Sequence, residues 1–403
     1  MYPSFVLPLD AELPFEPSRD HAFFFAVPSA PGVFLIETHA ASAASQRPYL
    51  SRTADLRRAA ERLLAVPDPA SKRLNLRARA KSFRYRVTGS RFEQLIVQYE
   101  QFRARIPSAY RDFLRLRPPA MLKINLRNAY PRCYVTRRLL DDGGVYVGPF
   151  ASRQTAESFA GRFLDLFKIR RCQIKIRRDP SFPGCIYSEM KMCLAPCFAG
   201  CSKEEYDAEV LQVAGALESQ GASLVAAVER ERETASEATD FEHAAVLHKR
   251  LEKISGVFRG MPEIIRRIEM LNAVILQRAA QEKTVALFAV VDGLIADPLF
   301  LSFGDMSQPR SAEEIIREHF QQFSQSPRSS ATPRCDTMNS GVADSRPAQD
   351  SARREEHLWL LARWFYSKPR EGEILFREGD WPYRKMLRAC ARALAPQPAP
   401  EQK

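Results

Sequence analysis

The chain has 403 residues, of which 45% are hydrophobic and 27% charged, an ordinary composition for a folded protein of roughly two to four domains. This composition excludes collagen-like and wholly disordered proteins. No run of about 18 uncharged apolar residues is present, and residues 1–20 lack a basic segment. We therefore expect no membrane span, no membrane partner, no secretory signal and a cytoplasmic location.

Basic residues are concentrated in one part of the chain. The sequence carries 60 Lys and Arg against 48 Asp and Glu, a net charge of +12, and residues 57–138 hold 21 basic residues against five acidic ones. Such a stretch predicts a face that binds a polyanion, because each neutralised phosphate releases condensed counterions. A solvated face in an arginine-rich sequence is the alternative. The residues that we expect to contact nucleic acid are Arg57, Arg77, Arg79, Lys81, Arg84 and Arg86.

Apolar spacing predicts strands and helices in the first half of the chain, after an irregular segment at residues 1–30. The expected strands are 33–36, 48–51, 122–126 and 133–136, and the expected helices are 54–66, 92–102 and 154–167.

The second half begins with a cysteine-dense segment and is then largely helical over 203–257. A β-hairpin is expected around Asp292-Gly293, from strands 285–291 and 294–303. Helices follow at 313–323 and 358–365. Between them, the polar segment 324–350 is rich in Ser and Pro, and we expect a disordered linker.

Four cysteines lie within 26 residues: Cys172, Cys185, Cys193 and Cys197. Disulfides are disfavoured in a chain without a secretory signal, so we interpret the four thiols as metal ligands. Their spacing does not distinguish a four-thiolate zinc site from a [4Fe–4S] cluster. Cys201 is an alternative ligand, and ordinary buried cysteines are the structural alternative.

Several motifs occur in a fixed order: Pro31-Gly32-Val33-Phe34, Tyr146-Val147-Gly148-Pro149-Phe150, Arg171-Cys172, Pro183-Gly184-Cys185-Ile186-Tyr187, Met192-Cys193-Leu194-Ala195-Pro196-Cys197 and Asp240-Phe241-Glu242-His243-Ala244-Ala245. Together they resemble the UvrC family, a component of the UvrABC excinuclease. In that family the cysteines hold a [4Fe–4S] cluster, so the resemblance implies this cofactor in preference to zinc. The family's RNase H-like nuclease is not expected before Lys403, so the resemblance is to truncated, Cho-like members.

The resemblance implies an α+β multidomain fold. The expected parts are a small GIY-YIG-like α/β nuclease domain at 25–120, a Cys-rich iron–sulfur module at 121–202, a helical UVR-like region at 203–262, a small β/α domain at 263–323, the linker at 324–350 and a C-terminal helical segment at 351–403.

The GIY-YIG-like domain is expected to be degenerate. The family's site uses two tyrosines, an arginine and a glutamate that holds a divalent metal, and the metal and arginine stabilise charge on the phosphoryl group. The first tyrosine position is Phe34, the arginine position is Ala59 and the glutamate position is Gln98. A neutral amide is a poor ligand for Mg²⁺, so the domain loses its metal anchor.

Three residues remain as candidate catalytic groups: Tyr49, Arg52 and Arg58. Mg²⁺ or Mn²⁺ is expected only if the site is active, with Glu93 or Glu100 replacing the lost carboxylate.

Residues 225–239 and 241–258 are expected to form an antiparallel helical hairpin, with Asp240 capping the second helix. The second helix resembles the UVR motif. The resemblance implies that UvrB, the excinuclease partner of that family, binds there through Phe241, Ala244 and Ala245. A hairpin packed wholly within the chain is the alternative.

The resemblance implies a nucleotide excision repair protein that binds damaged double-stranded DNA, with weak or lost phosphodiester incision. One alternative is a non-catalytic regulator that occupies DNA or UvrB. Another is a metal-cluster redox sensor.

Overall fold

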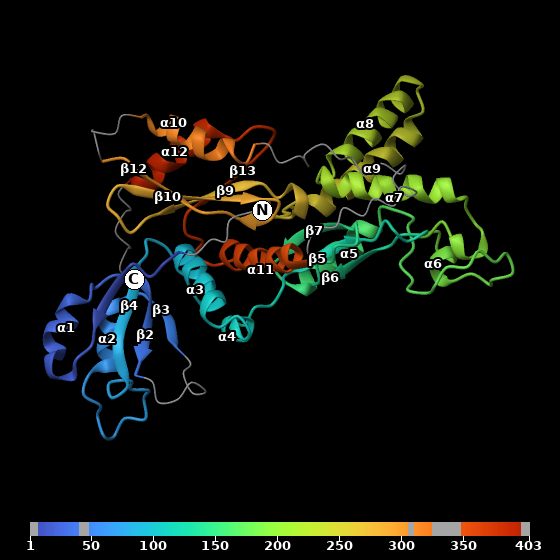
Figure 1. Cartoon of the computed structure of the whole chain (residues 1–403). Helices are drawn as coiled ribbons and strands as arrows, with labels where there is room; N and C mark the ends of the chain where they lie inside the picture. Colours follow the sequence, from blue (N-terminus) through green and yellow to red (C-terminus); the bar gives the residue numbers. More distant parts are fainter. Residues whose placement is uncertain (1–6, 40–47, 305–309, 325–347, 396–403) are drawn as a thin grey trace.

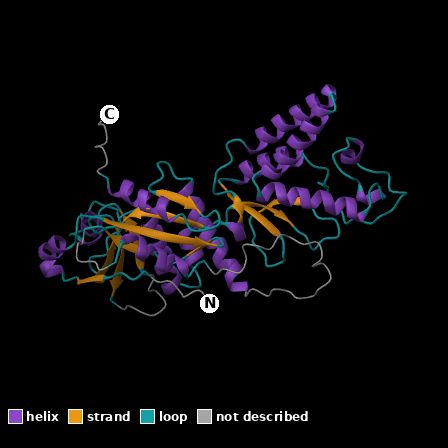
Figure 2. Ribbon diagram, turned by 90° about the horizontal axis from the view of Figure 1, so that it is seen from above, coloured by secondary structure: helices purple, strands orange, loops and turns teal. Residues whose placement is uncertain are grey.

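The computed structural model describes residues 7–39, 48–304, 310–324 and 348–395. Within this part the chain forms antiparallel β-sheets flanked by helices, and a helical hairpin that projects from the rest of the molecule (Figures 1 and 2). No helix in this part is both long and apolar enough to cross a bilayer.

The first sheet has the strand order β1-β4-β2-β3. Its strands are β1 (Ala11–Pro14), β4 (Ala80–Val87), β2 (Gly32–Thr38) and β3 (Tyr49–Thr53). Alternate residues of β2 face opposite sides: Phe34 and Ile36 pack with α2 (Leu56–Leu64), whereas Val33 and Leu35 belong to the core that contains α3 (Arg91–Arg105). The remaining helices of this region are α1 (Asp20–Ala26) and α4 (Tyr110–Leu114).

The second sheet has the order β6-β5-β7-β8. Its strands are β6 (Cys133–Thr136), β5 (Ala120–Ile124), β7 (Val145–Phe150) and β8 (Arg266–Arg267), and α5 (Arg153–Leu164) packs on it. Both β6 and β7 pair antiparallel with β5, so they run parallel to each other. The connection between them, residues 137–144, therefore crosses from one end of β5 to the other, and we call it the strap.

The third sheet is assembled from segments far apart in sequence. Its strands are β9 (Ala273–Arg278), β10 (Thr284–Val291), β11 (Leu294–Ile295), β12 (Leu299–Ser302) and β13 (Glu373–Phe376). One face packs on α10 (Ala312–Gln321) and α12 (Tyr383–Leu394), through Phe320 and Met386. The other face belongs to the core that contains Leu358 and Trp364 of α11 (Ala348–Phe365) (Figure 1).

The helical part follows the cysteine-dense segment. It contains α6 (Ile186–Glu189), α7 (Lys203–Glu218), α8 (Ala222–Glu237) and α9 (Phe241–Phe258). Helices α7 and α8 are separated by a turn at Gly221, whose φ is +90°. A Cβ atom there would lie 2.5 Å from the Phe258 ring, so only glycine fits the turn. Asp240 caps α9 as expected, because its carboxylate accepts a hydrogen bond from the His243 NH at 3.0 Å.

The predicted strands and helices are found, except that the expected strand 294–303 is divided into β11 and β12. The multidomain mixture of helix and strand agrees with the expected class at that level. Residues 1–30 differ from the expectation, because residues 11–14 pair with β4 and residues 20–26 form a helix. The strands β4 and β9 and the helix α12 were not expected. The predicted linker lies outside the described residues except at its ends, and the predicted domain boundaries stay predictions.

Candidate nucleic-acid interface and thiol cluster

The predicted nuclease site lies on the face of the first sheet that α2 covers. Phe34 is fully buried there and stacks on Phe83, with 5.1 Å between ring centroids. The half-buried Tyr49 ring lies 6.1 Å from Phe34. Tyr85 pairs with Phe34 across the sheet and brings a second hydroxyl to this face, which the sequence analysis missed. Burial raises the pKa of Tyr85, and the charge of Asp10 adds to the shift.

The three candidate catalytic residues do not converge. Arg52 pairs with Val33 in the β2–β3 register, so its side chain lies on the α3 face, opposite to Tyr49. Ala59 is buried in the face of α2 that packs on the sheet, and the neighbouring Arg58 is exposed. The structure thus places Tyr49 and Arg52 on opposite faces of the first sheet.

The acidic residues of α3 are engaged in other contacts. Glu93 accepts a hydrogen bond from the Gly89 NH at 2.9 Å and lies 3.6 Å from Arg86. Glu100 is 3.8 Å from Arg103, and burial raises its pKa to about 7. Gln98, between them, is only half-buried. Over the described ranges, no three His, Cys, Asp or Glu side chains have the arrangement of a metal-binding group.

Four of the six predicted DNA contacts bind the protein itself. Arg57 donates to the backbone carbonyls of Val27 and Phe25, at 2.8 and 3.1 Å. Arg77 donates to Leu64 and Pro17 carbonyls and lies 2.9 Å from Asp20. Arg84 forms ion pairs with Glu12 and Glu37, and Arg86 forms ion pairs with Asp10 and Glu93.

The other two predicted contacts, Arg79 and Lys81, are exposed. They belong to a larger group of exposed cations that lie at the end of α2, in the loop that joins α2 to β4, and at the start of β4. This group, which we call the loop cations, makes no ion pair with a described carboxylate and consists of Arg62, Lys72, Arg73, Arg79 and Lys81. Sequence reasoning did not single out the first three, although they stand in the predicted basic stretch.

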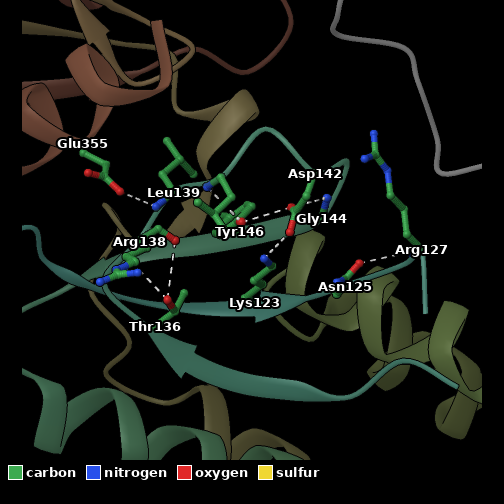
Figure 3. Close-up of polar contacts among 11 residues, drawn as sticks. Lys123, Asn125, Arg127, Thr136, Arg138, Leu139, Asp142, Gly144, Tyr146 and Glu355 are labelled. Carbon is green, nitrogen blue, oxygen red and sulfur yellow. Dashed lines mark hydrogen bonds and ion pairs between the residues drawn. The ribbon is translucent and has the colours of Figure 1, made fainter. Parts of the chain in front are cut away.

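The strap is fastened to the second sheet by a buried polar network (Figure 3). The Lys123 ammonium pairs with Asp142 and lies 5.0 Å from the centre of the Tyr146 ring. The Tyr146 hydroxyl donates to Asp142 at 3.1 Å and accepts from the Leu140 NH at 3.0 Å. Because Lys123 and Tyr146 are register partners, their side chains share the face that the strap crosses.

The four predicted ligand cysteines lie in one neighbourhood, which we call the thiol cluster. Burial, together with the charges of Cys172, Cys185 and Cys197, raises the pKa of Cys193 to about 11. The Ala195 NH, which donates to Cys193 Sγ at 3.3 Å, opposes this shift. Of these four cysteines, only Cys197 affects the pKa of Cys201, which favours the four predicted ligands over a set that includes Cys201. Cysteine sulfurs are the ligands that iron–sulfur clusters and zinc prefer, and the Ala195 NH would stabilise a thiolate at Cys193. Among the described residues the four sulfur atoms do not have the arrangement of a metal-binding group.

The backbone around the thiol cluster is strained. Lys191, Ala195 and Ala199 adopt φ values of 56°, 56° and 62°, in the left-handed region that non-glycine residues rarely occupy. Such conformations persist where the surrounding structure requires them, and they concentrate at functional sites. The thiol cluster also lies at the opposite end of the molecule from β2 and β3 (Figures 1 and 2). It is therefore remote from the predicted nuclease site.

The helical hairpin of α8 and α9 exposes part of its apolar surface. Phe241 is 69% exposed and Val246 63% exposed, whereas Leu251 is buried between the helices and the core. Ala244 is half-buried and Ala245 exposed. Phe241 and Ala245 are thus accessible on α9, Ala244 packs partly against the core, and Val246 is a second exposed apolar residue of the same helix.

Comparison with known proteins agrees with this arrangement of the middle of the chain. Residues 120–216 match the model of the UvrC/Cho excinuclease middle domain, a range that contains the strap and the thiol cluster. The UvrABC system protein C of Dehalococcoides mccartyi is 26% identical over 300 residues, which is 74% of this chain and 48% of that protein.

The chain contains a UvrC/Cho excinuclease middle domain. Its relative from Carboxydothermus hydrogenoformans is 23% identical over 299 residues, 73% of the chain and 48% of the relative. The relative from Nitratidesulfovibrio vulgaris is 31% identical over 195 residues, 47% of the chain and 26% of the relative. The chain thus spans about half the length of the first two relatives. No solved structure shows significant similarity to it.

Proposed function

We propose that this chain acts in nucleotide excision repair by binding damaged double-stranded DNA, and that its GIY-YIG-like domain no longer cuts. The observation behind this proposal is that Tyr49 and Arg52 lie on opposite faces of the first sheet, with Phe34 and Ala59 at two catalytic positions. Phosphodiester hydrolysis needs a cation beside the transferring phosphoryl group, and Tyr49 alone does not supply one. A non-catalytic regulator that occupies DNA would have the same geometry.

The loop cations are the proposed DNA contacts. An arginine already paired with a carboxylate neutralises little additional charge on a phosphate, which removes Arg77, Arg84 and Arg86 from the predicted set. Arg57 is removed because its guanidinium N–H groups are directed at the Val27 and Phe25 carbonyls. Exposed, unpaired cations release counterions in full when they meet DNA. Arg79 and Lys81 therefore stay in the proposed interface, joined by Arg62, Lys72 and Arg73.

The thiol cluster is the proposed site of a [4Fe–4S] cluster, held by Cys172, Cys185, Cys193 and Cys197, with zinc as the alternative. Such a cluster, when bound, supplies a redox-active centre that also crosslinks the segment. The buried Arg170 side chain, 3.9 Å from Cys172 Sγ, and the Ala195 NH would offset thiolate charge. Brown colour with broad visible absorbance supports iron–sulfur, and colourless, metal-free protein contradicts both choices.

The proposed site for UvrB is the exposed surface of α9 in the α8–α9 hairpin. Phe241 and Val246 offer apolar area that the chain does not bury. Replacing both by Ala should abolish capture of purified UvrB, whereas Leu211→Ala, at an exposed apolar residue of α7, should not. Equal capture by both variants would contradict the assignment.

The DNA contacts are tested by fluorescence anisotropy with a labelled, lesion-bearing duplex at several salt concentrations. Arg79→Ala combined with Lys81→Ala should lower the slope of log K against log salt by about 2, because each phosphate contact contributes about 1. The matched control replaces Lys385 and Arg388, two exposed cations of α12, by Ala. An equal decrease of the salt slope in the control pair would show that the loop cations contribute no more to DNA binding than other exposed cations.

A further inference from the structure

Arg52 lies on the α3 face of the first sheet, where β3 is the edge strand. The Gln94 side chain of α3 donates to the Thr53 carbonyl at 3.0 Å and holds this end of β3 against the start of α3. Arg91 is the first residue of α3, so it lies at the same junction. Arg363 lies on α11 next to Trp364, whose ring is 5.1 Å from the Phe92 ring in the first turn of α3 and whose Nε1 donates to the Glu371 carbonyl at 2.9 Å.

The environment of Arg52 is cationic. Burial lowers the pKa of its half-buried guanidinium, and the charges of Arg363 and Arg91 lower it further, with no carboxylate opposing them. Like charges that share a partly desolvated position destabilise the fold unless an anion lies between them. Glu371 is paired with Arg91, at 3.1 Å, and also accepts a hydrogen bond from the Arg91 backbone NH at 2.9 Å. Glu371 therefore offsets Arg91 and leaves two positive charges.

The other two guanidinium groups are open to solvent. The Arg91 side chain is 70% exposed, and Arg363 is exposed with its guanidinium 5.0 Å from the centre of the Trp359 ring. Stacking on an aromatic face orients an arginine and leaves its edge free to donate hydrogen bonds. Two arginines that no described carboxylate offsets, Arg52 of β3 and Arg363 of α11, therefore lie at one junction and can bind one tetrahedral anion.

We propose that Arg52 and Arg363 together bind one phosphate of the nucleic-acid backbone, beside the Glu371-paired Arg91, at a site distinct from the Tyr49 face. This inference rests on the proposed DNA binding and extends it, because it adds α11 to the interface. A backbone phosphate fits better than a small free anion, since Arg363 is exposed and the site lies at a sheet edge. The contact would join the first sheet to the C-terminal part of the chain across the bound duplex.

The test is the salt dependence of duplex binding, measured by anisotropy with the full chain. Arg363→Ala and Arg52→Ala should each weaken binding several-fold and lower the salt slope by about 1. Glu371→Gln keeps a hydrogen-bond acceptor, removes the negative charge and should tighten binding. Arg388→Ala is the control, because Arg388 is exposed on α12, on the other face of the third sheet.

Arg363 is exposed, so its removal should leave the melting temperature unchanged even if Arg52→Ala lowers it. Unchanged affinity and slope in Arg363→Ala and Arg52→Ala, with normal binding by the unaltered chain, would overturn the site while leaving the proposed function intact. Absence of DNA binding by the unaltered chain would overturn both. If inorganic phosphate raises the melting temperature in an Arg363-dependent way while DNA binding does not depend on Arg363, the site takes a free anion and the nucleic-acid assignment is wrong.

Discussion

At the scale of single residues, Glu356 of α11 fastens the C-terminal part of the chain to α3 and α4. Its carboxylate accepts hydrogen bonds from the Tyr99 and Tyr110 hydroxyls, both at 2.6 Å, and pairs with Arg111 at 2.7 Å. The carboxylate is almost wholly buried. Burial raises the pKa of Tyr99, and the nearby charge of Glu356 adds to the shift, so this tyrosine remains a donor.

Replacing Glu356 by Ala should lower the free energy of unfolding by about 2–4 kcal/mol, because two buried hydroxyls and one guanidinium lose their partner. Urea denaturation measures the change. The control is Glu378→Ala, whose side chain is 76% exposed and lies 4.0 Å from Arg266. Equal midpoints for the two variants would contradict the assigned role of Glu356.

Glu100 makes stability depend on pH. Burial raises its pKa to about 7, the charges of Arg103 and Arg353 oppose the shift, and those of Asp297 and Glu356 add to it. A carboxyl with a raised folded-state pKa binds its proton more tightly in the folded chain, so its contribution is present below the unfolded pKa and is lost as pH rises toward about 7. Glu100→Gln should therefore gain about 3 kcal/mol relative to the unaltered chain between pH ~4 and pH ~8. A difference that stays constant over that range would contradict this account.

The motif predicts which catalytic positions are replaced, but it does not predict which arginines make contacts within the protein. Phe34, Ala59 and Gln98 follow from the motif alone. The internal contacts of Arg77 and Arg86 involve Pro17 and Pro8, 60 and 78 residues away in sequence. No local pattern distinguishes such an arginine from one that faces solvent. Only the three-dimensional contacts separate the loop cations from the structural ones.

At the scale of elements, the strongest periodic patterns gave the most reliable predictions. Helices α2 and α3 were expected from apolar residues at three- and four-residue spacing, and those residues are buried. Strand β4 alternates aromatic and basic residues, Phe83-Arg84-Tyr85-Arg86, and its arginines pair with acids of other segments. The alternation typical of a strand is present in β4, but its basic residues were interpreted as a DNA-binding face. Helix α12 carries an apolar stripe that sequence reasoning could also have found.

The strap offers a test at this scale. Asp142→Asn would leave the Lys123 ammonium buried without its counter-charge, which should cost about 3–5 kcal/mol. Hydrogen exchange at the Leu140 and Gly144 NH groups should accelerate, because both depend on the same network. Asp141→Asn, at the exposed neighbouring carboxylate, is the matched control. Protection that survives Asp142→Asn would mean that the strap is held by its backbone alone.

At the scale of the whole molecule, the C-terminal residues complete structures that begin much earlier. Strand β13 pairs with β9 across about a hundred residues, and α11 contacts α3, β7 and β11. Sequence patterns do not report such pairings, because the segments resemble isolated elements when considered alone. The same long-range packing creates the Arg52 and Arg363 site, which no motif indicates.

The central claim is that this chain binds DNA and that the face of the first sheet carrying Tyr49 does not catalyse cleavage of the bound strand. The most direct measurement is one gel that follows an end-labelled, lesion-bearing duplex incubated with the protein and Mn²⁺, run natively for complexes and under denaturing conditions for nicks. The account predicts a salt-sensitive retarded complex and an intact strand. Nicks that Tyr49→Phe abolishes would contradict it, as would the absence of any complex at low salt.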